Sequence, residues 1–138
     1  MPTIFDNSAK RTRIRRVNSL FRVLWYRYIL SKYGDCDLLL WSNGGAHEVY
    51  IDGATEFYRG LEIREVWSTA FTTTSGHSDA LIERLLERNS QLKWGQWYIK
   101  GKRAGFRVLL AADANPESLR TAVELIAMEK EKILKEFR

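Results

Sequence analysis

Hydrophobic residues recur every three or four positions between about residue 10 and residue 33, which is the spacing of an apolar stripe on an amphipathic helix. The stripe consists of Ile14, Val17, Phe21, Leu24, Trp25 and Tyr28. Arg15, Arg16 and Arg22 fall outside this stripe. Gly34 follows it, and glycine is common just past the end of a helix. The pattern therefore predicts a first helix over about residues 10–33.

An alternating pattern replaces the helical one in the next part of the chain and predicts three strands. A short apolar run at 38–41 lies between the turn-forming stretches GDCD and SNGG. Asp52-Gly53 separates two β-prone runs in HEVYIDGATEFYR and predicts a hairpin turn. In the run 61–74, one face carries Leu61, Ile63, Trp67 and Phe71, and the other carries Glu62, Arg64, Ser68 and Thr72. We expect the first face to be buried and the second to be wet.

The second half of the chain predicts a helix, a hairpin and a last helix. Ser78 can cap the free N–H groups of a helix through DALIERLLERN. Strands follow near 92–100 and 105–112, joined by KGKRAG. Asn115-Pro116 then predicts a helix start, because proline is tolerated where its missing N–H has no partner to lose. The order is αβββαββα, which indicates an α+β fold with an antiparallel sheet and helices packed on one face.

This order resembles the fold of type III secretion chaperones and of the related YbjN-like family. The resemblance covers the whole chain in topology and is sharpest in LLERNSQLKWGQWYIKGKRAGFRVLLAADANPESL, residues 85–119. There the family pattern also runs helix, an Asn near its end, strand, Gly-containing turn, strand and long C-terminal helix. Secretion chaperones dimerise and capture extended segments of partner proteins. The resemblance therefore implies a chaperone-like domain that binds a partner protein as a homodimer.

The length of 138 residues is about that of one domain. No apolar run approaches the roughly 20 residues of a membrane-spanning helix. The N-terminal residues also lack the apolar segment of a secretory signal. We expect one domain over residues 1–138, with 1–9 as a loose N-terminus, no transmembrane segment and a cytoplasmic location.

Few residues suggest catalysis or a metal site. His47 and His77 are the two histidines, and neither has an orienting partner in its sequence neighbourhood. Cys36 is the single cysteine and stands without a CxxC or Cys/His set. Asp35 and Asp37 could share a metal, but turn-forming and strand-ending roles are far commoner for GDCD. We expect no enzyme and no cofactor.

The aromatic-rich hairpin is the predicted binding surface. By alternation, Leu92, Trp94 and Tyr98 point one way and Trp97 and Ile99 the other, while Phe106, Val108 and Leu110 oppose Leu109 and Ala111. Both faces are apolar on this interpretation, so the face without helices should be covered by another chain. The predicted partner-binding or dimer face consists of Trp94, Trp97, Tyr98, Ile99 and Leu109.

Positive charge in the N-terminal region supports an alternative function, the binding of nucleic acid. The net charge is +5, and eight basic residues without an acid lie between Lys10 and Lys32. Interleaved aromatic residues could stack on bases while the basic residues bind phosphates. The candidate anion or nucleic-acid contacts are Arg11, Arg13, Arg15, Arg16 and Arg22. A helix docked on the sheet with its arginines in solvent explains the same pattern, and a helix lying on an anionic membrane is a further possibility.

The sequence thus favours a non-enzymatic protein-binding domain, a chaperone or an adaptor or regulator that captures a partner protein as a homodimer. The alternative is a nucleic-acid-binding module that uses the basic N-terminal helix. An enzyme ranks third among these hypotheses.

Overall fold

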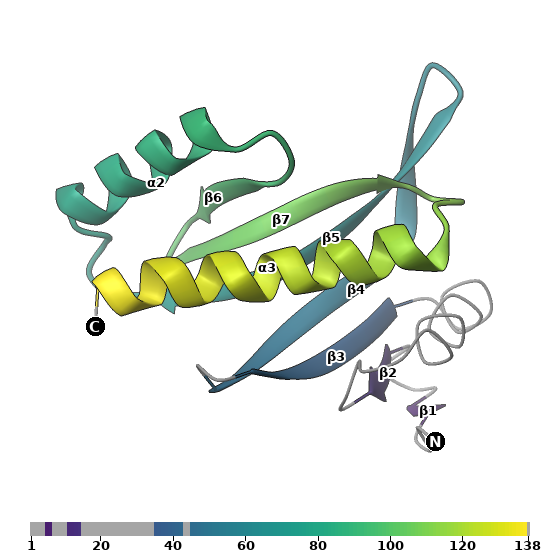
Figure 1. Ribbon diagram of the computed structural model, residues 1–138, viewed down its shortest axis with the longest axis horizontal. Helices are drawn as coiled ribbons and strands as arrows, with labels where there is room; N and C mark the ends of the chain where they lie inside the picture. The colour runs from purple at the N-terminus through teal and green to yellow at the C-terminus, as the bar shows by residue number, and fades with distance from the viewer. Residues whose placement is uncertain (1–4, 7–10, 15–34, 43–44, 138) are drawn as a thin grey trace.

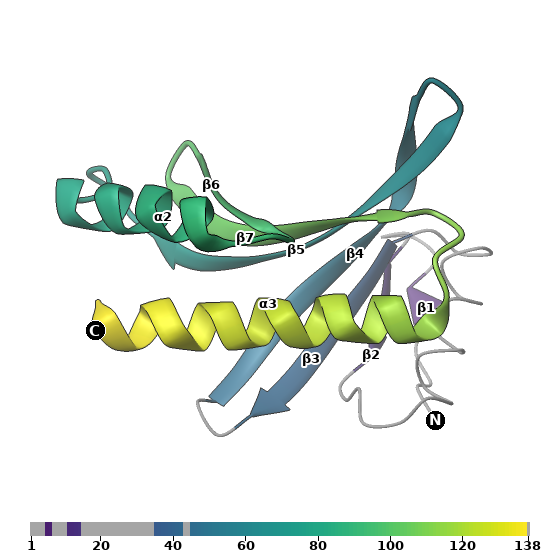
Figure 2. The ribbon, with the colours of Figure 1, turned by 45° about the horizontal axis from the view of Figure 1, so that its top comes forward.

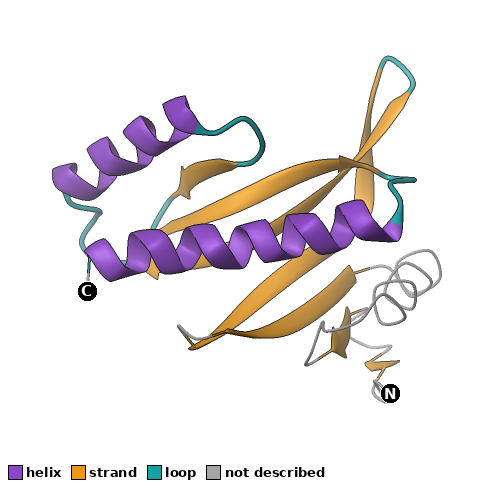
Figure 3. Cartoon of the chain, viewed as in Figure 1, coloured by secondary structure: helices purple, strands orange, loops and turns teal. Residues whose placement is uncertain are grey.

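The computed structural model of the protein consists of a long twisted sheet and two helices (Figures 1 and 3). The structure describes residues 5–6, 11–14, 35–42 and 45–137. The strands are β1 (Phe5–Asp6), β2 (Arg11–Ile14), β3 (Asp35–Ser42), β4 (Gly45–Tyr58), β5 (Leu61–Thr72), β6 (Gln96–Lys100) and β7 (Arg103–Ala111). The helices are α2 (Asp79–Gln91) and α3 (Pro116–Glu136).

The strands form one sheet in the order β1-β2-β3-β4-β5-β7-β6. All neighbours are antiparallel except β2 and β3, which are parallel. The predicted α+β class is therefore confirmed, with an antiparallel sheet through β3–β4–β5–β7–β6. The chaperone-like fold itself stays a prediction.

The predicted first helix is wrong at its start, because residues 11–14 form β2. This strand runs alongside residues 35–38 of β3, and its β-branched Thr12 and Ile14 suit an extended backbone. A tertiary pairing has here overridden the helical spacing of apolar residues. The rest of the predicted helix, from residue 15 on, lies outside the described residues.

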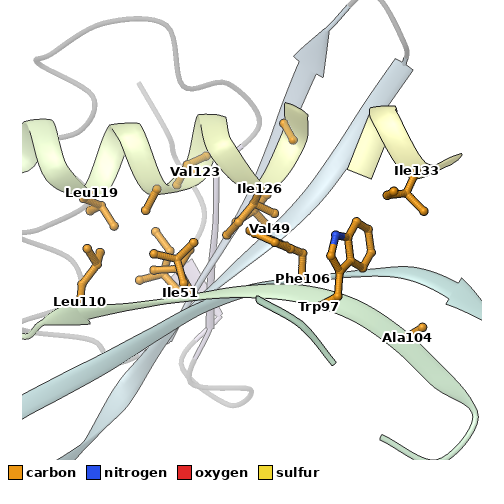
Figure 4. Close-up of a cluster of buried hydrophobic side chains, with 14 of the residues drawn as sticks. Val49, Ile51, Trp97, Ala104, Phe106, Leu110, Leu119, Val123, Ile126 and Ile133 are labelled. Atoms are coloured by element: carbon orange, nitrogen blue, oxygen red, sulfur yellow. The ribbon is translucent and has the colours of Figure 1, made fainter. Parts of the chain in front are cut away.

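The core lies between α3 and the sheet (Figure 4). Alternate residues of β7 point under the helix: Ala104, Phe106, Val108 and Leu110. The opposing stripe of α3 consists of Leu119, Ala122, Val123, Ile126, Ala127 and Ile133. Burying each large apolar side chain contributes about 1.5–3 kcal/mol. Figure 2 shows α3 as a layer of its own alongside β7 and β5.

The predicted orientation of β5 is wrong. Val66 and Ser68 are buried, whereas Trp67 lies opposite Arg107 on the other face of the sheet. A register shift just before Phe71 restores that ring to the core side. Such a bulge adds one residue and inverts the alternation beyond it, so a strict two-residue pattern over 61–74 could not be correct along its whole length.

The predicted turn at Asp52-Gly53 is also wrong, because β4 continues through it. The two residues lie instead at a register shift between β4 and β5. Nη1 of Arg64 donates to the carbonyl oxygens of Asp52 at 2.7 Å and Gly53 at 3.0 Å. The turn is Arg59-Gly60, with φ of 53° and 87°, the left-handed conformation that a tight two-residue hairpin requires. Figure 1 shows this hairpin projecting beyond the helices.

Both predicted helix starts are confirmed. The Ser78 hydroxyl accepts a hydrogen bond from the N–H of Leu81 at 3.2 Å. Oδ1 of Asn115 accepts one from the N–H of Ser118 at 2.8 Å, directly before Pro116. Side-chain caps of this kind satisfy N–H groups that the helix leaves free, so they can be identified from local sequence.

Asn89, in the last turn of α2, attaches that helix to the outer strand β6. Its Nδ2 donates to the carbonyl of Trp97 at 2.9 Å, and its Oδ1 accepts from the N–H of Trp97 at 2.7 Å. The side-chain amide thus occupies backbone groups that would otherwise pair with another strand. The Trp97 indole packs edge-to-face on Phe106, with ring centroids 5.4 Å apart.

The two hairpin tryptophans should respond differently to a charge. Trp97 is 4 % exposed within the core, whereas Trp94 is 36 % exposed. Trp97→Glu should cost about 3–5 kcal/mol or more, because it removes a buried ring and buries a carboxylate. That is enough to unfold a domain of ordinary stability, whereas Trp94→Glu should retain the fold. Urea unfolding followed by circular dichroism measures the stability of both variants. An equal loss of stability in the two would contradict the assignment of Trp97 to the core and of Trp94 to the surface.

Candidate functional site

The face of the sheet opposite α2 and α3 is the candidate site. It carries the residues that alternate with the core positions of β5, β6 and β7. We define the open face as Trp67, Tyr98, Arg103, Arg107 and Leu109. Neither described helix covers it, since the core residues that meet those helices all lie on the other face.

Arginines lie over aromatic rings on the open face. Cζ of Arg103 is 5.8 Å from the centroid of the Trp67 ring, and Cζ of Arg107 is 5.9 Å from that of Tyr98. Tyr50 of β4 stacks on Trp67, with centroids 4.4 Å apart and planes at 23°. Each cation–π contact contributes about 0.5–1 kcal/mol at an exposed site. The contacts therefore favour positions over the rings for these two flexible side chains.

Polar contacts fix the same side chains further. Nε1 of Trp67 donates to Oδ1 of Asp52 at 3.0 Å. Nη1 of Arg107 lies 3.7 Å from Oε1 of Glu65. Burial raises the pKa of Tyr98, so its hydroxyl remains protonated and able to donate at neutral pH. A surface with rings and cations already in place loses little entropy when it binds.

Gly105 creates the space that Tyr98 occupies. A Cβ at position 105 would lie 2.8 Å from the Tyr98 hydroxyl oxygen and would also collide with the carbonyl of Ser68. A glycine inside a strand is a recognised sign of close approach by another group. The glycine of RAGFR was therefore a usable signal in the sequence for this part of the open face.

The structure separates the five predicted binding residues. Tyr98 and Leu109 lie on the open face, and Leu109 is 48 % exposed. Nε1 of Trp94 donates to the carbonyl of Leu109 at 3.4 Å, which brings Trp94 to this region. Trp97 belongs to the core and is removed from the binding set, while Ile99 is exposed but lies on the same face as Trp97.

The premise that both faces of the hairpin are apolar is also wrong. Arg103 and Arg107 alternate with the core residues of β7, and Gln96 lies opposite Arg107 on β6. Sequence reasoning missed these arginines and Trp67 because it followed apolar residues alone and assigned Trp67 to the covered face. The same alternation, extended to polar residues, would have found Arg103 and Arg107.

The predicted anion contacts lie mostly beyond what the structure describes. Arg11 and Arg13 fall in β2, in a strand instead of a helix. Arg15, Arg16 and Arg22 lie outside the described residues. Their role in binding an anion or nucleic acid stays a prediction.

The two histidines differ in their surroundings. His47 is buried between β4 and α3, and its Nε2 lies 3.0 Å from Oε1 of Glu131. Nε2 of His77 is buried and has no hydrogen-bond partner in the described part of the chain. Over those same residues, no group of three His, Cys, Asp or Glu side chains is placed to hold a metal ion. None of the helices the structure describes is long and apolar enough to cross a membrane.

A buried serine–lysine pair is the other arrangement with chemical potential. Nζ of Lys130 donates to Oγ of Ser68 at 2.7 Å, and Oγ of Ser68 donates to the carbonyl of Glu48. Burial lowers the pKa of Lys130 to about 8, and the charge of Glu48 opposes the shift. Some enzymes use such a pair as nucleophile and base. Here Ser68 is fully buried beneath α3, so the pair links the helix to the sheet and offers no surface to a substrate.

No known family model matches this chain, and no curated protein matches it. The open face combines half-buried aromatic rings with the exposed Arg103 and Leu109.

The buried Lys130 should make stability depend on pH. Its pKa falls from the ordinary 10.5 to about 8, so between these values the unfolded chain binds a proton that the native protein has released. Stability should therefore rise with pH between these two values. At lower pH, burial of the charged Lys130 should reduce the free energy of unfolding by about 3 kcal/mol.

Lys130→Met should abolish that rise, while the exposed Lys135→Met serves as the control. Urea unfolding at pH 7 and pH 9.5 measures the difference between each variant and the wild type. The stability of Lys130→Met should exceed that of the wild type by more at pH 7 than at pH 9.5. An identical difference at both pH values would show that Lys130 does not titrate in this range.

Proposed function

We propose that this protein is a non-enzymatic protein-binding domain, a chaperone or an adaptor or regulator, that captures a partner protein and works as a homodimer. The observation that carries the proposal is the open face, where Arg103 lies over Trp67 and Arg107 lies over Tyr98. A domain with its two described helices on one side of the sheet leaves such a surface for another molecule.

The residue types of the open face suit a protein partner. Tryptophan, tyrosine and arginine are enriched among residues that dominate the free energy of protein–protein binding. Leu109 and the adjacent Trp94 add apolar area that water covers in the free chain. Such an arrangement, with apolar residues beside hydrogen-bonding ones, is typical of a protein interface.

Charge on this face also favours a protein over a nucleic acid. The carboxylates of Asp52 and Glu65 lie among the aromatic and cationic residues, bonded to Trp67 and paired with Arg107. A phosphate backbone carries a negative charge at every nucleotide, so it would meet these carboxylates as like charges along its length. A protein segment can place its own polar groups to suit both signs.

Burial supports a non-enzymatic role. Lys130, whose pKa is strongly lowered, is enclosed beneath α3 together with Ser68. The groups of the open face serve instead as binding groups, because its arginines and rings are suited to recognition and its tyrosine stays protonated.

Partner capture tests the proposal with two matched variants. Leu109→Glu places a charge on the open face, and Leu86→Glu places the same charge on the outer side of α2, where Leu86 is 65 % exposed. The wild type and Leu86→Glu should retain one and the same protein from lysate of the source cells, and Leu109→Glu should lose it. Purified components should then reproduce the difference. Equal retention by both variants would refute a role for the open face.

Sedimentation tests the dimer in the same preparations. The wild-type chain should sediment at twice its 16.1 kDa mass. A monomer across the micromolar range would refute the homodimer while leaving partner capture to stand on its own measurement.

A further inference from the structure

The hairpin of β6 and β7 carries positive charge without acidic residues. Between Asn89 and Ala112 the sequence contains five basic residues and no Asp or Glu. The five are Lys93, Lys100, Lys102, Arg103 and Arg107. Local charge of one sign attracts and orients partners of the opposite sign.

Few carboxylates of the described residues lie near this charge. Arg107 is 3.7 Å from Glu65. Within residues 45–137, no carboxylate lies at ion-pair distance from Lys100, Lys102 or Arg103, and Arg103 lies instead over the Trp67 ring. The open face therefore includes a fixed cation that lacks a carboxylate partner in the described part of the chain.

The geometry of Arg103 suits a carboxylate ligand. A guanidinium held over an aromatic ring keeps its in-plane N–H groups for other acceptors. Those groups match a carboxylate in a two-bond arrangement, which is among the stronger charge-assisted hydrogen bonds. Arg107 is also held over a ring, but Glu65 already lies 3.7 Å from its Nη1, so Arg103 is the cation of the open face that a partner's carboxylate would meet.

The outer edge of the sheet is a poorer place for the partner. The amide of Asn89 already occupies the N–H and the carbonyl of Trp97 in the middle of β6. A strand added to this edge would have to displace those bonds. The partner should therefore lie across the open face and leave β6 as the outermost strand.

We infer that the open face binds an acidic extended segment of the partner protein, with a carboxylate at Arg103 and apolar side chains at Tyr98 and Leu109. This inference rests on the proposed function and specifies its partner. In an extended segment, residues two positions apart point to the same side, so acidic and apolar residues at every second position would both meet the open face.

Fluorescence anisotropy with a labelled peptide of repeated Glu-Ser-Val-Ser, the Glu–Val probe, tests the inference, because this repeat presents Glu and Val on one side of an extended chain. The wild type should bind this probe at least tenfold more tightly than the same peptide with Lys in place of Glu, and more tightly than single-stranded oligothymidylate of equal length. Arg103→Glu should weaken the Glu–Val probe at least tenfold. Arg103→Lys should weaken it less, because lysine keeps the charge but loses the two-bond geometry.

Lys132→Glu, on the exposed side of α3, is the matched control and should leave binding of the Glu–Val probe unchanged. Circular dichroism verifies that each variant is folded. Equal binding of the Glu and Lys peptides, tighter binding of oligothymidylate, or no binding of the Glu–Val probe would overturn the inference. If the purified partner is still lost with Leu109→Glu in those cases, the proposed function stands and only the acidic segment is wrong.

Discussion

The packing of α3 against β7 determines which face of the sheet is covered, and the rest of the structure follows from it. Phe106 and Val108 point under the helix, so the residues between and beside them must point away. Because α2 also joins this core through Leu81 and Leu85, both described helices lie on one side. A surface of fixed rings and arginines on the other side is the direct consequence.

Polar contacts determine how the helices sit on that core. Apolar contacts alone would let a helix slide slightly on the sheet. The buried ammonium group of Lys130 reaches its acceptor, Oγ of Ser68, in only one position of α3, so this hydrogen bond fixes the helix on the sheet. Between the helices, Arg84 pairs with Glu136 at 2.7 Å and Arg88 donates to the buried Glu129 at 2.7 Å. These pairs connect α2, which holds β6 through Asn89, to α3, which covers β7. The hairpin that carries Tyr98 and the arginines is thus supported from two sides.

Sequence patterns predicted the parts of this fold that depend on neighbouring residues. The caps at Ser78 and Asn115 and the paired strands of the hairpin belong to this group. Long-range pairing decided the rest. The Asp52-Gly53 dipeptide has strong turn propensity, yet Arg64 from the next strand satisfies its carbonyls within a continuous β4. A bulge between Thr69 and Phe71 likewise puts Trp67 and Phe71 on opposite faces, although strict alternation places both on one face.

Hydroxyl-radical footprinting of the purified chain, alone and in complex with its isolated partner, tests the division into covered and open faces most directly. In the free chain, Trp94 and Tyr98 should be oxidised much faster than the buried Trp97. In the complex, oxidation of Tyr98 and Trp67 should slow markedly, and that of Met128, exposed on α3, should not change. Protection of Met128 with unchanged oxidation of Tyr98 and Trp67 would contradict the account and place the partner on the helical side.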